Sequence, residues 1–190
     1  MLRAGTRAAR ELRDIADGFV ADGYRIADDG ERFRLERDGA TPVCVGMARQ
    51  GRIFGGSYPL EISTAEPVLP KTHGLRGRPR GVVRLGGIDF HARSGDQIGR
   101  MLAARLERDE RLQRALADVH FDRIRVEPDG RATIRHVGGG VVWMLFPPLV
   151  RPIPFIPEQR RATLAALEAF AAIEENPRSL QGLKGGAGGA

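Results

Sequence analysis

Tight turns between segments of alternating polarity are the feature that most constrains the fold of this chain. An Asp-Gly pair at 29–30 separates two short segments in which apolar residues alternate with charged ones. Two-residue turns of this kind join antiparallel strands, and this one would set Ile26 opposite Phe33. A second pair of alternating segments surrounds the Pro-Asp-Gly turn at 128–130. The sequence therefore predicts strands that pair antiparallel with their neighbours along the chain.

Three segments have the apolar spacing of amphipathic helices. Leu12, Ile15 and Phe19 would lie on one face of a helix near the N-terminus. A capping box at 94–97 predicts the start of a second helix, and an apolar stripe at 164–171 predicts a third. The predicted order is a helix, three or four strands, a helix, three strands and a helix. We therefore predict an α+β fold, an antiparallel sheet with helices packed on one face.

The length of the chain fits one domain. With 190 residues there is room for a single core, which we place at 1–177, followed by a flexible Gly-rich tail at 178–190. The Gly- and Pro-rich segment 67–84 is expected to be a loop. The longest apolar run, 141–150, is shorter than the roughly 20 residues that a membrane-spanning helix needs. The N-terminus lacks the apolar core of a secretory signal, so a cytoplasmic protein is expected.

Positive charge is concentrated in one part of the chain. The net charge is +6, from 30 basic and 24 acidic residues. No Asp or Glu occurs between Glu66 and Asp89, and the cations of this interval nearly account for the whole excess. We take these cations as candidate anion-binding residues: Lys71, Arg76, Arg78, Arg80 and Arg84. Arginine side chains and loop amides both bind phosphates and carboxylates.

This basic loop leads to the principal functional hypothesis. A non-enzymatic interaction or adaptor module would bind an acidic protein or another polyanion through the loop. A weak nucleic-acid binder is the alternative, although residues 67–88 contain no aromatic side chain on which bases could stack. An anionic membrane surface is a third kind of partner. A solvated loop that binds nothing is also consistent with the sequence, because an arginine-rich composition can follow from a GC-rich genome.

One carboxylate–imidazole pair raises the alternative of an enzyme. A hairpin around 128–130 would pair Ile124 with Ile134. The same register would bring Asp122 opposite His136. This dyad could act as a general base in a small hydrolase-type enzyme, or it could be a structural hydrogen bond. The isolated histidines and the single cysteine predict neither a metal site nor a cofactor.

The apolar segment VVWMLFPPLVRPIPFIP at 141–157 has two interpretations. It can form a strand that is covered on both faces, followed by a stiff polyproline-like connection. Alternatively, it exposes an apolar ridge that marks a partner surface or a membrane surface.

Several loose motifs are shared with a known family. They are DERLQRAL at 109–116, HFD at 120–122 and a pattern of prolines, arginine and glutamine from Pro147 to Gln159. With the basic segment that enters a strand, they resemble a bacterial family of proteins of unknown function over about residues 20–175. The order of helices and strands also resembles the type III secretion chaperone-like fold. Neither resemblance implies an activity.

Overall fold

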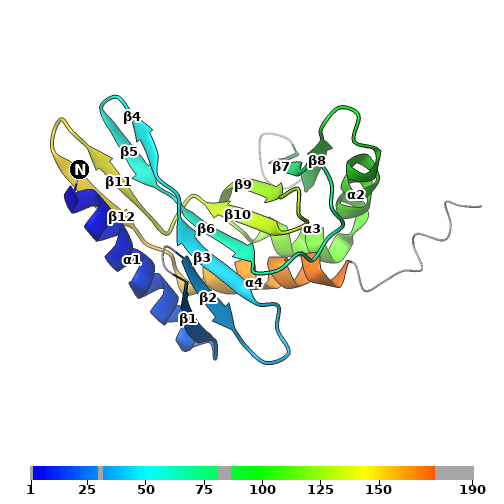
Figure 1. Cartoon of the computed structure of the whole chain (residues 1–190), viewed down its shortest axis with the longest axis horizontal. Coiled ribbons are helices and arrows are strands. Elements are labelled where there is room, and N and C mark those ends of the chain that lie inside the picture. The colour runs from blue at the N-terminus through cyan, green and yellow to red at the C-terminus, as the bar shows by residue number, and fades with distance from the viewer. Residues whose placement is uncertain (1, 30–31, 81–86, 174–190) are drawn as a thin grey trace, which may run out of the picture.

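The computed structural model describes residues 2–29, 32–80 and 87–173, whose arrangement is shown in Figure 1. Within these ranges the helices are α1 (Leu2–Val20), α2 (Gln97–Arg108), α3 (Glu110–Ala117) and α4 (Pro157–Ala172). The first eight strands are β1 (Arg25–Asp29), β2 (Arg32–Glu36), β3 (Val43–Met47), β4 (Gln50–Arg52), β5 (Gly55–Tyr58), β6 (Leu60–Thr64), β7 (Leu75–Pro79) and β8 (Ile88–Ala92). Between α3 and α4 follow β9 (Phe121–Val126), β10 (Ala132–His136), β11 (Gly140–Met144) and β12 (Leu149–Ile153).

The strands form two antiparallel sheets. An eight-stranded sheet has the order β1-β2-β3-β6-β10-β9-β7-β8, and a four-stranded sheet has the order β12-β11-β5-β4. The chain passes from β5 into β6 and from β10 into β11 with only short interruptions, so the two sheets are joined by nearly continuous strands. The predicted antiparallel pairing is confirmed. The described residues form twelve strands, however, where six or seven were expected.

One apolar core joins the helices to one face of the eight-stranded sheet. Alternate strand residues point into this core, among them Val45, Ile62 and Ile134, which are fully buried. Each helix contributes a fully buried side chain to the same core: Phe19, Leu106, Leu116 and Phe170. The α+β class, with helices on one face of an antiparallel sheet, is therefore confirmed.

The second predicted helix is divided in two. Asp96 begins α2, because its side chain accepts a hydrogen bond from the Gly99 N–H at 2.7 Å. Ser94, the cap expected from the sequence, lies too early, before a glycine with a φ of +83°. Asp109 interrupts the helical run with an extended backbone and caps α3 by accepting from the Leu112 N–H at 2.8 Å.

The two predicted hairpins differ in their registers. Ile124 lies opposite Ile134 between β9 and β10, as predicted. Between β1 and β2, Ile26 lies opposite Leu35 instead of the predicted Phe33. A shift of two residues leaves Ile26 on the same face of the sheet, since side chains alternate with a period of two. The closing residues 30–31 lie outside the described ranges.

The basic segment at 67–84 is only partly a loop. Residues 75–79 form β7, which pairs with β8 on one side and with β9 on the other. A Cβ atom at Gly77 would lie 3.1 Å from core side chains of both neighbouring strands, so the glycine permits this close packing. Residues 81–84 and the tail at 178–190 lie outside the described ranges.

The apolar segment at 141–157 forms the outer hairpin of the four-stranded sheet. Val141 and Trp143 of β11 are buried on one face, but Met144 on the other face is 39% exposed, so the strand is not covered on both faces as expected. The polyproline-like connection is wrong for the residues that follow, because Leu149–Ile153 pair with β11 as strand β12. Nowhere in the described ranges does a helix combine the length and apolar character that crossing a bilayer requires.

Candidate anion-binding site

The eight-stranded sheet has a polar face on the side away from the helices. The same alternation that sends apolar side chains into the core sends the residues between them to this face. Cross-strand register places His91, Arg76 and Arg125 in one row across β8, β7 and β9. The row continues over β10, β6, β3 and β2 through Thr133, Ser63, Cys44 and Arg34.

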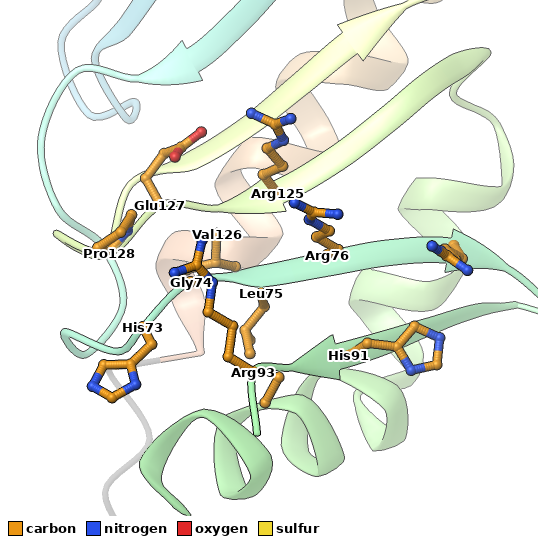
Figure 2. Close-up of a pocket in the computed structure, with 12 residues that line it drawn as sticks. His73, Gly74, Leu75, Arg76, His91, Arg93, Arg125, Val126, Glu127 and Pro128 are labelled. Carbon is orange, nitrogen blue, oxygen red and sulfur yellow. The ribbon is translucent and has the colours of Figure 1, made fainter. Parts of the chain in front are cut away.

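A hollow of about 580 Å³ lies on this face at the β7–β8–β9 end of the sheet (Figure 2). We call it the arginine hollow, because four arginines line it together with two histidines and a single carboxylate. Its ionisable lining residues are His73, Arg76, Arg78, His91, Arg93, Arg125 and Glu127. Arg76 and Arg125 lie side by side on neighbouring strands, and Arg93 extends from the end of β8 towards Gly74 (Figure 2).

The arginines of the hollow form no ion pairs with carboxylates of the described residues. Among the described residues, no Asp or Glu oxygen lies within 4.0 Å of the guanidinium groups of the four lining arginines. Arg125 is half-buried, and its Nε is shielded from solvent with no hydrogen-bond partner among the described residues. A buried donor without an acceptor is costly, so this geometry favours an anionic acceptor supplied from outside.

Two arginines elsewhere on the same face are paired with carboxylates. Arg34 bonds to Glu36 at 2.6 Å and to Glu66 at 3.0 Å, while Arg135 is paired with Glu61. These paired arginines differ from the four that line the hollow, which have no ion-pair partner among the described residues.

A buried carboxylate fixes one wall of the hollow. The Asp96 side chain accepts from the His73 N–H at 2.7 Å as well as from the Gly99 N–H at the start of α2. These two amide donors lower the pKa of Asp96. The Thr72 N–H donates to the Pro128 carbonyl at 3.2 Å and so ties the same loop to the β9–β10 turn.

Replacing Asp96 by alanine is expected to lower the melting temperature by several degrees, because two amide donors lose their acceptor. Asp109→Ala is the matched control, since Asp109 also caps a helix but accepts from only one amide, and a smaller decrease is expected. The folded state lowers the pKa of Asp96, so its stabilisation is complete above the unfolded pKa and is lost as the pH falls through the folded pKa. Thermal denaturation from neutral to acidic pH measures both effects. Equal decreases for the two variants would contradict the second role of Asp96.

The predicted anion-binding residues are only partly brought together. Arg76 and Arg78 line the hollow. Arg80 instead bonds to Asp89 at 2.8 Å through its Nε, and Lys71 is exposed outside the hollow's lining. Arg84 lies outside the described residues.

Sequence reasoning missed Arg93 and Arg125 altogether. The signal for Arg125 was present in the alternation of β9, where charged residues surround Ile124. It could not be used, because the pairing of β7 with β9 joins segments nearly fifty positions apart. His73 and His91 were noticed but were taken as isolated residues, whereas both line the hollow.

The expected pairing of Asp122 with His136 is wrong. A β-bulge between Arg135 and His136 shifts the register by one residue, so that Phe121 lies opposite the histidine. Asp122 is exposed, while His136 is 3% exposed with its Nε2 3.3 Å from the Thr163 hydroxyl oxygen. Burial lowers the pKa of His136 to about 4. The two side chains therefore do not form the dyad on which the hydrolase interpretation was based.

Within the described ranges, no three His, Cys, Asp or Glu side chains gather as metal ligands would. The groups that line the hollow, guanidinium and imidazole, are suited to the recognition of negative charge.

The fold and the hollow together define an α+β protein with an arginine-lined hollow on the polar face of its eight-stranded sheet. A family model described as "Protein of unknown function (DUF3156)" matches residues 21–173, and the chain belongs to this family. The resemblance to a family of unknown function is thereby confirmed. No curated protein matches the chain, and no solved structure does either, so the resemblance to the secretion chaperone-like fold has no support.

Proposed function

We propose that the protein is a non-enzymatic interaction module that binds an acidic segment of a partner protein in the arginine hollow. The observation that carries this proposal is the contrast in charge pairing across one sheet face. Arg34 and Arg135 have carboxylate partners, whereas the arginines of the hollow have none among the described residues. A group of like charges held on a sheet is stabilised by an anion that bonds to several of them.

Carboxylates spaced along a peptide suit the hollow. Arg76 and Arg125 are direct neighbours across β7 and β9, so one carboxylate can accept from both guanidinium groups. Arg93, at the end of β8, offers a separate position for a second carboxylate. A volume of about 580 Å³ accommodates several side chains of an extended segment.

Recognition through side chains is favoured because the neighbouring sheet edge is closed. The outward N–H groups of Ile88 and Phe90 on β8 already donate to Gln113 and Glu107, both at 2.7 Å. A partner strand therefore cannot add to this edge in the way that strand-addition partners do. The lining also contains no Phe, Tyr or Trp side chain on which a base could stack, which disfavours single-stranded nucleic acid.

The proposal is tested with a fluorescent peptide rich in Asp and Glu, compared with its amide counterpart of Asn and Gln. Fluorescence anisotropy at low salt should show binding of the acidic peptide alone, and added salt should weaken it. The Arg76→Gln/Arg125→Gln variant should lose affinity by about tenfold or more, because two charge-assisted contacts are removed.

Arg34→Gln/Arg131→Gln is the matched control, since it removes the same charge from arginines that are paired within the protein. This control should bind the acidic peptide nearly as tightly as the native chain. Equal losses in the two variants would show that net charge, and not the hollow, attracts the peptide. Tighter binding to an oligonucleotide of equal charge would replace the protein partner by nucleic acid.

A further inference from the structure

Two hairpin loops of the four-stranded sheet lie together and expose large apolar side chains. They are the β4–β5 and β11–β12 loops, which project at the end of the molecule away from β7 and β8 (Figure 1). The Leu145 N–H donates to the Phe54 carbonyl oxygen at 3.0 Å and joins the two loops. Phe54 is 72% exposed and Phe146 is 82% exposed. We call this group the apolar tip: Ile53, Phe54, Leu145 and Phe146.

Exposed apolar side chains are concentrated at this end of the molecule. Seven of the twelve large apolar side chains that are exposed in the described ranges lie within 53–54 and 144–150. Single exposed apolar residues are common on soluble proteins. A group of this size indicates a surface that binds another protein or a membrane.

The same part of the molecule carries no carboxylate. No Asp or Glu occurs within 1–10, 39–60 or 130–157. The last two ranges contain the whole four-stranded sheet, and the first contains the start of α1, which packs against β11 and β12. We call this unit, the four strands with the first turns of α1, the small-sheet lobe.

The small-sheet lobe also presents cations. Arg7 and Arg10 are exposed on α1, and Arg151 is exposed on β12. Figure 1 shows the N-terminal part of α1 alongside β11 and β12. The lobe therefore combines a projecting apolar end with positive charge behind it, and no negative charge opposes an anionic surface.

We propose that the small-sheet lobe docks on an anionic lipid bilayer, with the apolar tip inserted at the membrane interface. Aromatic and aliphatic side chains on loops partition into the interfacial region, and cations near them are attracted by anionic headgroups. A bilayer suits this surface better than a protein does, because the four side chains project outwards from two loops and their neighbours carry only positive charge. The arginine hollow lies at the other end of the molecule, so this docking is independent of its ligand.

The test is co-sedimentation with vesicles of phosphatidylcholine, with and without phosphatidylserine. The native chain should bind the vesicles that contain phosphatidylserine, and added salt should weaken the binding. Phe54→Ser/Phe146→Ser should reduce the partition coefficient between vesicles and water by about tenfold or more. The variant lacks the two aromatic rings whose transfer from water into the membrane interface favours binding. In Phe54→Trp, brominated lipids should quench fluorescence beyond the level given by the native Trp143.

Two matched variants make the outcome specific. Val20→Ser/Ile98→Ser removes two other exposed apolar side chains, which are 52% and 57% exposed, and should bind as the native chain does. Arg76→Gln/Arg125→Gln should also bind normally, which separates membrane docking from the function of the hollow. Folding of each variant is checked by its circular dichroism and melting temperature.

Some results would overturn the proposal. These are no binding to vesicles with phosphatidylserine at low salt, or equal binding by the folded Phe54→Ser/Phe146→Ser variant. A native dimer in sedimentation that this variant converts to a monomer, without vesicle binding, would assign the apolar tip to a second copy of the chain instead.

Discussion

Replacing Gly130 by alanine is expected to lower the free energy of unfolding by about 3 kcal/mol or more. The residue has a φ of +97°, a backbone conformation that side chains other than glycine rarely adopt. An added Cβ would also overlap the carbonyl oxygen of Leu69. That carbonyl cannot simply move away, because the N–H groups of Val68 and Leu69 donate to the Gly130 oxygen at 3.2 and 3.1 Å. Urea denaturation at neutral pH measures the loss.

Gly39→Ala separates the two causes of this loss. Gly39 also has a positive φ, of +72°, but an added Cβ would meet no atom within 4 Å. Its substitution should cost only about 1 kcal/mol, the cost of the backbone conformation alone. The difference between the two variants then reports the contact between the β9–β10 turn and the segment that leads to β7. Similar losses at both positions would contradict an important role for that contact.

Local signals predicted the fold well wherever a turn joins strands that are neighbours in the sequence. The Pro-Asp-Gly turn at 128–130 sets Ile124 opposite Ile134, as expected, because a short turn determines the register of its hairpin. The alternation of apolar residues also identified which face of each strand enters the core. These two properties depend on a few adjacent residues, and they were sufficient for the α+β class.

The candidate site depends on pairing that no local signal specifies. Arg76 and Arg125 become neighbours only because β7 inserts between β8 and β9. The charge gap between Glu66 and Asp89 did identify a basic segment, but the alternation within β7 decides which of its arginines share a face. Arg80 lies just after β7, and its side chain bonds to Asp89 of β8 instead of lining the hollow.

One extra residue was enough to remove the predicted dyad. The bulge between Arg135 and His136 rotates the end of β10 relative to β9, which places Phe121 opposite the histidine. The alternation of residues in the sequence did not indicate the bulge, because it is compatible with a regular ladder in which Asp122 lies opposite His136. The same bulge is associated with the burial of His136 beneath α4, where Thr163 accepts its hydrogen bond.

The burial of His136 leads to a second prediction. The free energy of unfolding should decrease in mild acid, because the His136 imidazole takes up a proton on unfolding. The Thr163 hydroxyl donates to the Gln159 carbonyl at 2.6 Å, so the Nε2 of His136 must be the donor in its contact with Thr163. Phe155 packs against the ring with centroids 4.9 Å apart. The neutral imidazole suits this environment, whereas a second proton would introduce a positive charge that is shielded from water.

Burial lowers the pKa of His136 from 6.5 in the unfolded chain to about 4 in the folded protein. Between these values the unfolded state binds the extra proton, so the folded state loses stability as the pH falls from the unfolded pKa to the folded pKa. The full loss is about 3 kcal/mol, since each unit of difference corresponds to about 1.4 kcal/mol. Above the unfolded pKa the contribution is complete and does not change with pH.

His136→Gln tests this effect because glutamine keeps a hydrogen-bond donor but cannot take up a proton. Urea denaturation at about pH 7.5 should show the variant less stable than the native chain, since it loses the packing with Phe155. At about pH 4.5 the difference should shrink or reverse, because only the native chain is penalised by protonation. All other titrating groups are shared by the two chains and cancel in the comparison. A difference in unfolding free energy that is the same at both pH values would show that His136 does not couple folding to proton binding.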